Sequence, residues 1–344
     1  MKSIIEQSSD RSDMYRFLVE FDNQWDEAIF ADSNRDYSAV REYKNIQRII
    51  IAGMGGSAIA GEIVSRYASL NLAIPVFIVR NYQLPLIKPN DLVICASYSG
   101  NTEETLSAFS GAIGNCRVIG ISSGGELAKR CRAESIPHFL LPKGFPPRCA
   151  FGHSLITLSG ILKELNLGFG DFFRELKDLS PLIRENINRW KIENNNFAVQ
   201  IASFLQEGIP LIYTETGLME SVGVRWRGQI SENAKILAYN SAIPEMNHNE
   251  IVGWDNSFSH IGNFRCVMLR TSNCHPRNSR RMDLVSEHIG KNCMIAEIDS
   301  RKSEVENVIS FIQLGDFVSY YLAMLKKIDP SPVKTIDWLK SQLA

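Results

Sequence analysis

The sequence lacks an excess of charge of either sign. Its 37 lysines and arginines stand against 38 aspartates and glutamates, which gives a formal net charge of −1, and no block of basic residues stands out. Because nucleic acids and acidic membrane surfaces attract clustered lysines and arginines, we expect neither as a partner. No apolar run approaches the length of a transmembrane helix, and the first seven residues lack the apolar core of a signal peptide.

CxxC motifs are also missing, and the seven cysteines are odd in number. Several of them lie inside apolar, strand-like runs, where a thiol packs as a small hydrophobic group. We therefore expect free thiols in a reducing, cytoplasmic setting rather than a disulfide framework. Cys274 and His275 form the only adjacent Cys–His pair, and one such pair without further spaced ligands does not predict a metal site. We expect neither a metal nor a cofactor.

The chain does have the length and apolar content for two ordinary domains, with 344 residues of which 44% are hydrophobic and 22% charged. From residue 47 onward, near-continuous apolar runs alternate with helical stretches, which is typical of parallel sheets covered by helices on both faces. We therefore expect an α/β fold with two doubly wound domains. The predicted strands lie at 49–52, 75–79, 92–96, 117–121, 138–141, 209–213, 265–269 and 293–298.

The same alternation suggests where the domains begin and end. Residues 1–155 would form an amphipathic helical arm and the first domain, and residues 156–195 a helical connection. Residues 196–344 would form the second domain and end in a short helix after the prolines at 330 and 332. The two halves look like two copies of one architecture.

Two loops rich in glycine and hydroxyl residues stand out in the first half. Each follows an apolar run and precedes a predicted helix, whose first N–H groups lack partners and whose dipole favours an anion. The carboxyl ends of parallel strands meet at one edge of a sheet, so both loops can hold one phosphate from two sides. We expect a phosphorylated small molecule as ligand, bound by Gly55, Gly56, Ser57, Ser97, Ser99 and Thr102.

Other interpretations of these loops stay open. The first loop fits the G-x-G-x-x-A dinucleotide fingerprint from Gly53 onward, and Arg80 at the end of the next strand could meet the 2′-phosphate of NADP. A dinucleotide, however, leaves the hydroxyls of the second loop unexplained. The glycines could also form a tight turn without a ligand. Asn101 or Thr102 could be a simple helix N-cap, which accounts for one hydroxyl of three.

Together the loops resemble the sugar isomerase (SIS) domain, which binds phosphosugars. Later stretches resemble the bifunctional phosphoglucose/phosphomannose isomerase family: a Pro-Arg segment at 146–154, Glu-Asn-Ala-Lys at 232–235, a histidine motif at 245–254 and a terminal helix at 329–340. The resemblance covers nearly all residues from about 45 to 344. It implies two SIS domains and an isomerase that interconverts glucose 6-phosphate, and also mannose 6-phosphate, with fructose 6-phosphate through ring opening and a cis-enediol.

The resemblance also implies roles for four residues. Glu232 would be the base that moves a proton between C2 and C1. His248, which related isomerases take from the neighbouring subunit, would open the sugar ring, so the resemblance implies a homodimer with shared active sites. Arg148 would stabilise an enediolate oxygen, and Lys340 would assist ring opening.

Each of these residues also has a plainer interpretation. Glu232 could be a solvated carboxylate that pairs with Lys235 or Arg225. His248 could be a loop histidine bonded to a neighbouring asparagine. Arg148 could be a surface residue after the Pro-Pro turn, and Lys340 an exposed lysine of the last helix.

The sequence departs from the family pattern at Ser231, Cys149 and Phe151, none of which removes a catalytic group. Two other activities remain possible: an amino-sugar phosphate isomerase, and a non-catalytic phosphosugar sensor. Sensors of this kind usually carry a helix-turn-helix, and no basic recognition helix is visible in the sequence.

Overall fold

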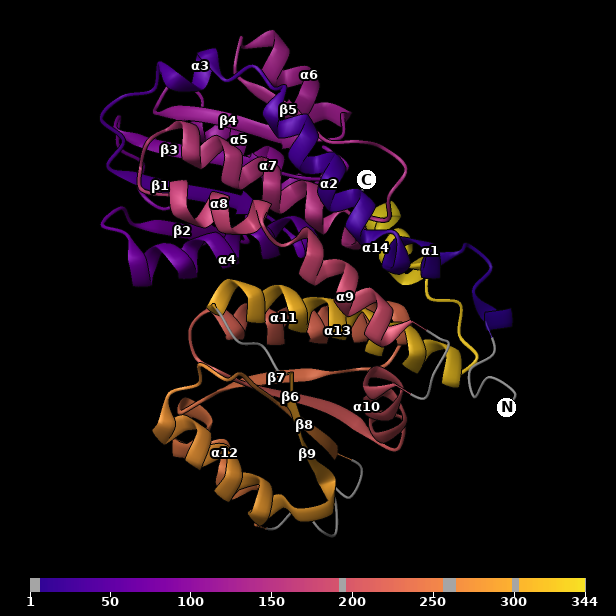
Figure 1. Cartoon of the computed structure of the whole chain (residues 1–344). Helices are drawn as coiled ribbons and strands as arrows, with labels where there is room; N and C mark the ends of the chain where they lie inside the picture. Colours follow the sequence, from indigo (N-terminus) through magenta and orange to yellow (C-terminus); the bar gives the residue numbers. More distant parts are fainter. Residues whose placement is uncertain (1–6, 192–195, 256–263, 299–302, 344) are drawn as a thin grey trace. The chain divides into compact units, whose positions relative to one another are not determined.

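The computed structural model describes residues 7–191, 196–255, 264–298 and 303–343 (Figure 1). The chain divides into two compact units. We call Glu20–Pro181 the N-terminal unit, and Met1–Val19 together with Leu182–Ala344 the C-terminal unit. The domain limits suggested by the sequence, at residues 155 and 196, remain a prediction.

The N-terminal unit is built on one parallel sheet with the strand order β2-β1-β3-β4-β5. Successive side chains of a strand point to opposite faces. Ile50 and Ala52 of β1 accordingly pack with residues of α5 and α6, while Ile51 meets Gly61 of α4, where an added Cβ would lie 2.9 Å from the Ile51 Cγ2. Helices therefore cover both faces.

The strands of this unit are β1 (Arg48–Gly53), β2 (Val76–Val79), β3 (Asp91–Ala96), β4 (Arg117–Ser122) and β5 (His138–Leu140). Its helices are α2 (Phe21–Ser33), α3 (Ser38–Arg41), α4 (Gly55–Asn71), α5 (Glu103–Ala112), α6 (Gly125–Ala133), η2 (Pro147–Cys149), α7 (Phe151–Glu164) and α8 (Gly170–Lys177). Helix α9 (Ser180–Trp190) begins in this unit and continues into the other.

The C-terminal unit has a second parallel sheet with the order β7-β6-β8-β9. Helix α12 packs on one face of it, and α10, α11 and α13 lie on the other (Figure 1). The strands are β6 (Ile209–Glu215), β7 (Tyr239–Ile243), β8 (Phe264–Arg270) and β9 (Cys293–Glu297). The helices are η1 (Gln7–Ser9), α1 (Met14–Val19), α10 (Phe197–Gln206), α11 (Leu218–Ala234), η3 (Glu245–His248), η4 (Glu250–Trp254), α12 (Pro276–Ile289), η5 (Gly290–Asn292), α13 (Glu304–Leu325) and α14 (Lys334–Leu343).

The α/β class predicted from the sequence, with parallel sheets covered by helices, is confirmed. The amphipathic helical arm expected before the first domain is divided between the units, as far as it lies within the described residues. Helix α1 packs on α13, with the rings of Tyr15 and Tyr320 5.4 Å apart, whereas α2 packs on α7.

Helix α13 corrects the expectation that no apolar run approaches the length of a transmembrane helix. It has 22 residues, and the mean hydropathy of its most apolar 18-residue window is 1.5, so it is long and apolar enough to cross a membrane by length and composition. However, 89% of its most apolar window is buried inside the fold. It is the central helix of the C-terminal unit, where α10 and α11 pack against it.

Candidate active site

Both glycine and hydroxyl loops lie where the strand order of the N-terminal sheet reverses. β1 and β3 are neighbours, but the chain leaves β1 toward β2 on one side and leaves β3 toward β4 on the other. In open α/β sheets the crevice at this switch point is the usual ligand site. The first loop ends in the first turn of α4, and the second leads into α5.

Three of the predicted hydroxyls come together there. The Ser97 and Thr102 hydroxyl oxygens are 2.8 Å apart and hydrogen bonded. The N–H of Tyr98 donates to the Ser57 hydroxyl over 3.1 Å, which joins the second loop to the first. Ser99 is exposed on the same loop, where its hydroxyl accepts the N–H of Asn101 over 3.2 Å.

These contacts decide two of the alternative interpretations. Thr102 does stand at the N-cap of α5, but its side chain makes no capping bond and contacts Ser97 instead. The Asn101 side chain accepts the N–H of Glu126 at the start of α6, over 2.9 Å. Arg80, the candidate for a 2′-phosphate, forms an ion pair with Glu62 of α4. The hydroxyls therefore do not serve as simple caps, and Arg80 pairs with a carboxylate of its own unit instead of standing open to a 2′-phosphate.

We call the space bordered by the two loops, with the hydroxyls of Ser57, Ser97, Ser99 and Thr102, the cradle. Two glycines shape it. Gly55 has a φ of +51°, and a Cβ added there would meet nothing within 4 Å, so the space in front of α4 is open. A Cβ at Gly56 would lie 3.1 Å from the Pro147 carbonyl oxygen and 3.4 Å from the Arg148 Cα. The missing side chain thus allows the first turn of α4 to lie directly against the backbone of Arg148.

Arg148 belongs to the 3₁₀ turn η2 and is only 5% exposed, so its interpretation as a surface residue is wrong. The preceding loop is held by Tyr98, whose phenol donates to the Pro142 carbonyl over 2.9 Å and accepts the Phe145 N–H over 3.0 Å. Burial raises the pKa of Tyr98 and keeps its phenol neutral. The structure therefore brings Arg148 next to the cradle.

Glu232 lies in the last turn of α11 and is half-buried. Lys235 follows in the left-handed conformation with a φ of 55°. Its ammonium group donates to the backbone oxygen of Glu232 and, over 3.0 Å, to that of Pro330. These bonds tie the end of α11 to the segment that leads into α14.

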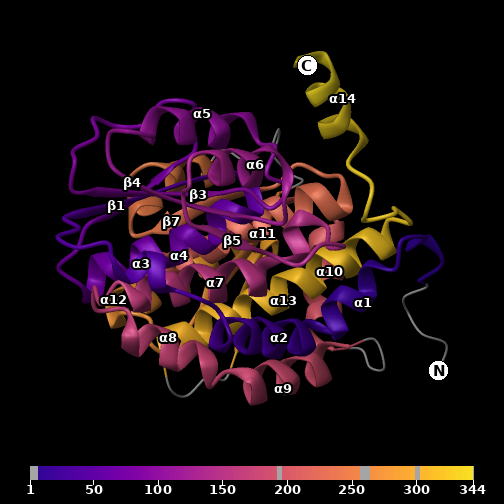
Figure 2. The same cartoon turned by 90° about the horizontal axis from the view of Figure 1, so that it is seen from above.

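A cavity of about 730 Å³ opens at this junction. Ser231, Glu232 and Lys235 line it from α11, and residues of the 329–336 segment line it from the other side. Lys340 lies farther along α14, outside this lining. All side chains of α14 are exposed, and Figure 2 shows the helix standing clear of α10 and α13.

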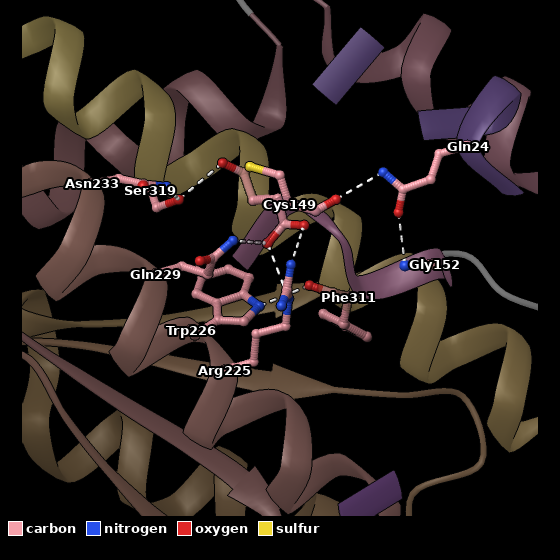
Figure 3. Close-up of polar contacts among 10 residues, drawn as sticks. Gln24, Cys149, Gly152, Arg225, Trp226, Gln229, Asn233, Phe311 and Ser319 are labelled. Atoms are coloured by element: carbon pink, nitrogen blue, oxygen red, sulfur yellow. Dashed lines mark hydrogen bonds and ion pairs between the residues drawn. The ribbon is translucent and has the colours of Figure 1, made fainter. Parts of the chain in front are cut away.

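Arg225 does not pair with Glu232, as one interpretation had suggested. It is buried in a bidentate pair with Asp316 of α13, with Nη2–Oδ2 and Nε–Oδ1 distances of 2.8 and 3.2 Å (Figure 3). Gln229 donates to the same carboxylate over 2.7 Å, and Asn233 donates to the Ser319 hydroxyl over 3.0 Å. This polar seam fixes the rotation of α11 and therefore the direction of Glu232.

His248 is the exposed last residue of η3, which follows β7. The two asparagines beside it have other contacts: Asn249 donates to the Glu245 carboxylate over 3.0 Å, and the Asn247 amide lies 3.1 Å from the Met246 sulfur. Helix α11 ends just before β7 begins, and η3 follows the end of β7. Glu232 and His248 of one chain are therefore at opposite ends of β7.

The C-terminal unit repeats the switch point between β6 and β8 but fills it differently. Glu215, the last residue of β6, accepts the backbone N–H of His275 over 3.0 Å and the Asn278 amide over 2.7 Å, both at the start of α12. A carboxylate thus occupies the helix end that a phosphate would approach.

Comparisons with known proteins agree with this arrangement. Residues 194–343 match the model of the bacterial phospho-glucose isomerase C-terminal SIS domain. The chain is 38% identical over 307 residues to the bifunctional phosphoglucose/phosphomannose isomerase of Caldicellulosiruptor bescii, covering 88% of this chain and 91% of that protein. It is 34% identical over 342 residues to the protein of the same name from Aquifex aeolicus, covering 96% and 98%.

Among solved structures, the C-terminal domain of glucosamine-fructose-6-phosphate aminotransferase from Francisella tularensis matches with a TM-score of 0.76 and 17% identity, covering 95% of this chain and 99% of that one. This likeness concerns the fold. The identity to the two curated relatives over nearly the whole chain goes further: the chain belongs to the bifunctional phosphoglucose/phosphomannose isomerase family.

Proposed function

We propose that the chain is an aldose–ketose isomerase that interconverts glucose 6-phosphate, and also mannose 6-phosphate, with fructose 6-phosphate. The observation that carries this proposal is the cradle of the N-terminal unit. Hydroxyls from two loops gather at the β1/β3 switch point, directly against the backbone of a buried arginine. Family membership supports the same reaction, with a phosphosugar as substrate.

In this reaction the cradle binds the 6-phosphate. The hydroxyls of Ser57, Ser97, Ser99 and Thr102 and the backbone N–H groups at the start of α4 and α5 donate to its oxygens. The distal phosphate is the same in aldose and ketose, so these contacts bind both equally. They lower KM and locate the sugar, while the chemistry needs other groups.

Glu232 acts as the base. Its carboxylate takes the proton from C2 of the open-chain aldose and returns it to C1, while the hydroxyl proton of O2 moves to O1. The carbonyl group thereby moves from C1 to C2 through a cis-enediol, with no change in atoms or electrons overall. The cavity beside Glu232 supports this role because it gives the carboxylate a site open to a ligand.

Arg148 stabilises the negative oxygen that develops as the proton leaves carbon. A guanidinium group is permanently charged and presents a planar set of donors, and burial strengthens its attraction to an oxyanion. Lys340 assists ring opening from α14, whose exposed apolar side chains Ile336, Leu339 and Leu343 are available to pack over a bound sugar.

The ring-opening histidine comes from a second copy of the chain. Glu232 and His248 lie at opposite ends of β7, and a strand of five residues separates its ends by roughly 13 Å at about 3.3 Å per residue. One hexose ring does not span that separation. We therefore propose a homodimer in which each active site combines Glu232 of one protomer with His248 of its partner.

The deciding test is a coupled assay of the purified protein on glucose 6-phosphate and mannose 6-phosphate, before and after dialysis against EDTA. Production of fructose 6-phosphate from both is expected, and dialysis is expected to leave the rate unchanged. In the described residues no three His, Cys, Asp or Glu side chains gather as metal ligands. A loss restored by Zn²⁺ would refute the metal-independent mechanism.

Two other outcomes would identify the rival functions. Turnover of glucosamine 6-phosphate alone would point to an amino-sugar isomerase. Tight phosphosugar binding without turnover would point to a sensor. None of the seven cysteines forms a disulfide, which supports a reducing, cytoplasmic location for the enzyme.

A further inference from the structure

We propose that Gln24 is a positioning residue for Arg148. Its side-chain amide clamps the turn that carries Arg148 and thereby holds the guanidinium group at the reacting oxygen. This inference rests on the proposed function, because it needs Arg148 to act in isomerisation. Gln24 itself lies in the N-terminal arm, more than a hundred residues before the turn.

The clamp consists of two hydrogen bonds. Gln24 lies on α2 and is 3% exposed. Its Nε2 donates to the Cys149 carbonyl oxygen over 2.7 Å, and its Oε1 accepts the Gly152 N–H over 2.8 Å (Figure 3). The planar amide thus satisfies one backbone acceptor and one backbone donor on either side of the start of α7.

Local sequence supplies no substitute for these bonds. The N–H of Gly152 belongs to the first turn of α7, whose amides have no partner within the helix. The N-cap residue of α7 is Ala150, which makes no side-chain capping bond. Gly152 also leaves room for the clamp, because a Cβ there would lie 2.8 Å from the Gln24 Oε1.

The clamped turn is the one that contains Arg148. Arg148 immediately precedes Cys149, and the Cys149 N–H closes the turn on the Pro146 carbonyl over 2.8 Å. On the opposite side, Gly56 of the phosphate cradle lies against the Arg148 Cα. The backbone of Arg148 is therefore fixed between the cradle and Gln24, so a shift of the amide changes where the guanidinium points relative to a bound phosphosugar.

A purely structural role would have different consequences. Loss of two buried hydrogen bonds leaves buried polar groups unsatisfied, which lowers Tm but leaves the kcat of the folded enzyme intact. A positioning role lowers kcat at temperatures where the variant is fully folded, because small misplacements of a catalytic group cost up to about 100-fold in rate.

The principal variant is Gln24→Glu. It keeps the shape and the acceptor for Gly152 but replaces the donor to Cys149 with an oxygen. We expect kcat for fructose 6-phosphate to fall roughly 10- to 100-fold, while KM stays within about twofold because the phosphate contacts are intact. The matched control is Asn23→Asp, the same chemical change at the exposed neighbouring position of α2, which should alter neither constant.

A double-mutant cycle then assigns the effect to Arg148. In the Arg148→Ala background, Gln24→Glu should lower kcat no further, since the group it positions is gone. If the two substitutions lower kcat by multiplicative factors, the proposal is overturned. It is also overturned if Gln24→Glu alone lowers Tm but leaves kcat normal. Gly152→Ala displaces the amide without removing it, so it serves if Gln24→Glu fails to fold; a normal kcat in that variant would also overturn the clamp. If Arg148→Ala itself retains full activity, the assigned role of Arg148 is wrong rather than the clamp geometry.

Discussion

Glu232 precedes β7 and His248 follows it, so the two side chains belong to opposite ends of the same strand. In a dimer with shared sites, a chain that lacks the base and a chain that lacks the histidine can form one intact site between them. We expect co-expressed Glu232→Gln and His248→Ala chains, each inactive alone, to recover about a quarter of wild-type activity, because half of random dimers are mixed and half of their sites are intact.

Size-exclusion chromatography and native mass spectrometry would check that mixed dimers form. The control is a pair of chains that both carry the two substitutions, which should stay inactive. Absence of recovery despite verified mixed dimers would mean that the proposed pairing across subunits is wrong.

Proton transfer at carbon and ring opening should respond to different substitutions. Glu232→Gln keeps the shape of the side chain and loses its basicity, so we expect kcat to fall by at least ~10³-fold. Solvent tritium exchange into an open-chain analogue such as arabinose 5-phosphate should also stop. His248→Ala should strongly slow the turnover of closed-ring sugars, and it should slow this tritium exchange much less. If both variants lose exchange equally, the roles are not divided as proposed; if Glu232→Gln retains it, the exposed Glu245 and Glu250 beside His248 become the candidates.

The phosphate cradle should act mainly through substrate binding. We expect the double variant Ser99→Ala/Thr102→Ala to raise KM for fructose 6-phosphate by roughly 10-fold or more, because hydrogen bonds to a charged group contribute about 1.5–3 kcal/mol each. The kcat at saturation should change little. Ser107→Ala, an exposed hydroxyl on α5 that bonds the Tyr82 carbonyl, is the control. An unchanged KM in a folded double variant would rule the cradle out.

We predict that His153 makes the folded protein less stable in mild acid. It is 3% exposed on α7, and its Nε2 has no hydrogen-bond partner among the described residues. Burial, together with the charge of Arg35, lowers the pKa of His153 to about 4 from its usual value of 6.5. The unfolded chain therefore takes up a proton near pH 6.5 that the folded chain refuses until about pH 4, so stability is full above pH 6.5 and declines as the pH falls toward 4.

The loss amounts to at most about 3 kcal/mol, from 1.36 kcal/mol per pKa unit. Urea unfolding at several pH values would measure it. We expect His153→Leu to flatten the curve between pH 6.5 and 4.5 relative to wild type; an identical slope in both proteins would show that other groups cause the decline.

The sheets could be predicted where burial on both faces leaves a continuous apolar run, as in β3, whose six residues are all buried. β7 was missed because Tyr239–Ile243 mixes polar and apolar residues at the edge of its sheet, where only Ile243 is buried. The glycine and hydroxyl loops are visible in the sequence because their groups lie within a few residues of one another.

The supporting residues of the site are the part that the sequence did not reveal. Gln24 bonds Gly152 from 128 residues away, and no local pattern marks such a pair. Asp316 did leave a signal, since it is a lone acid in the middle of an apolar helix. It faces Arg225 and Gln229, which together with Asn233 recur every four residues on α11. A stripe of polar residues on a buried helix requires hydrogen-bond partners, because burying a polar group without such a partner costs free energy of folding.

Glu215 gives the duplicated architecture an unequal binding capacity. The two sheets share their strand order around the switch point, yet in the C-terminal unit a carboxylate already neutralises the helix end that would attract an anion. A second phosphate there would meet like charge instead of open N–H groups. Calorimetric titration with inorganic phosphate should therefore saturate at one anion per chain, and Glu215→Gln should lower the stability of the α12 end. The C-terminal unit therefore provides its own carboxylate in place of a bound phosphate, and it contributes Glu232 and His248 to the proposed reaction.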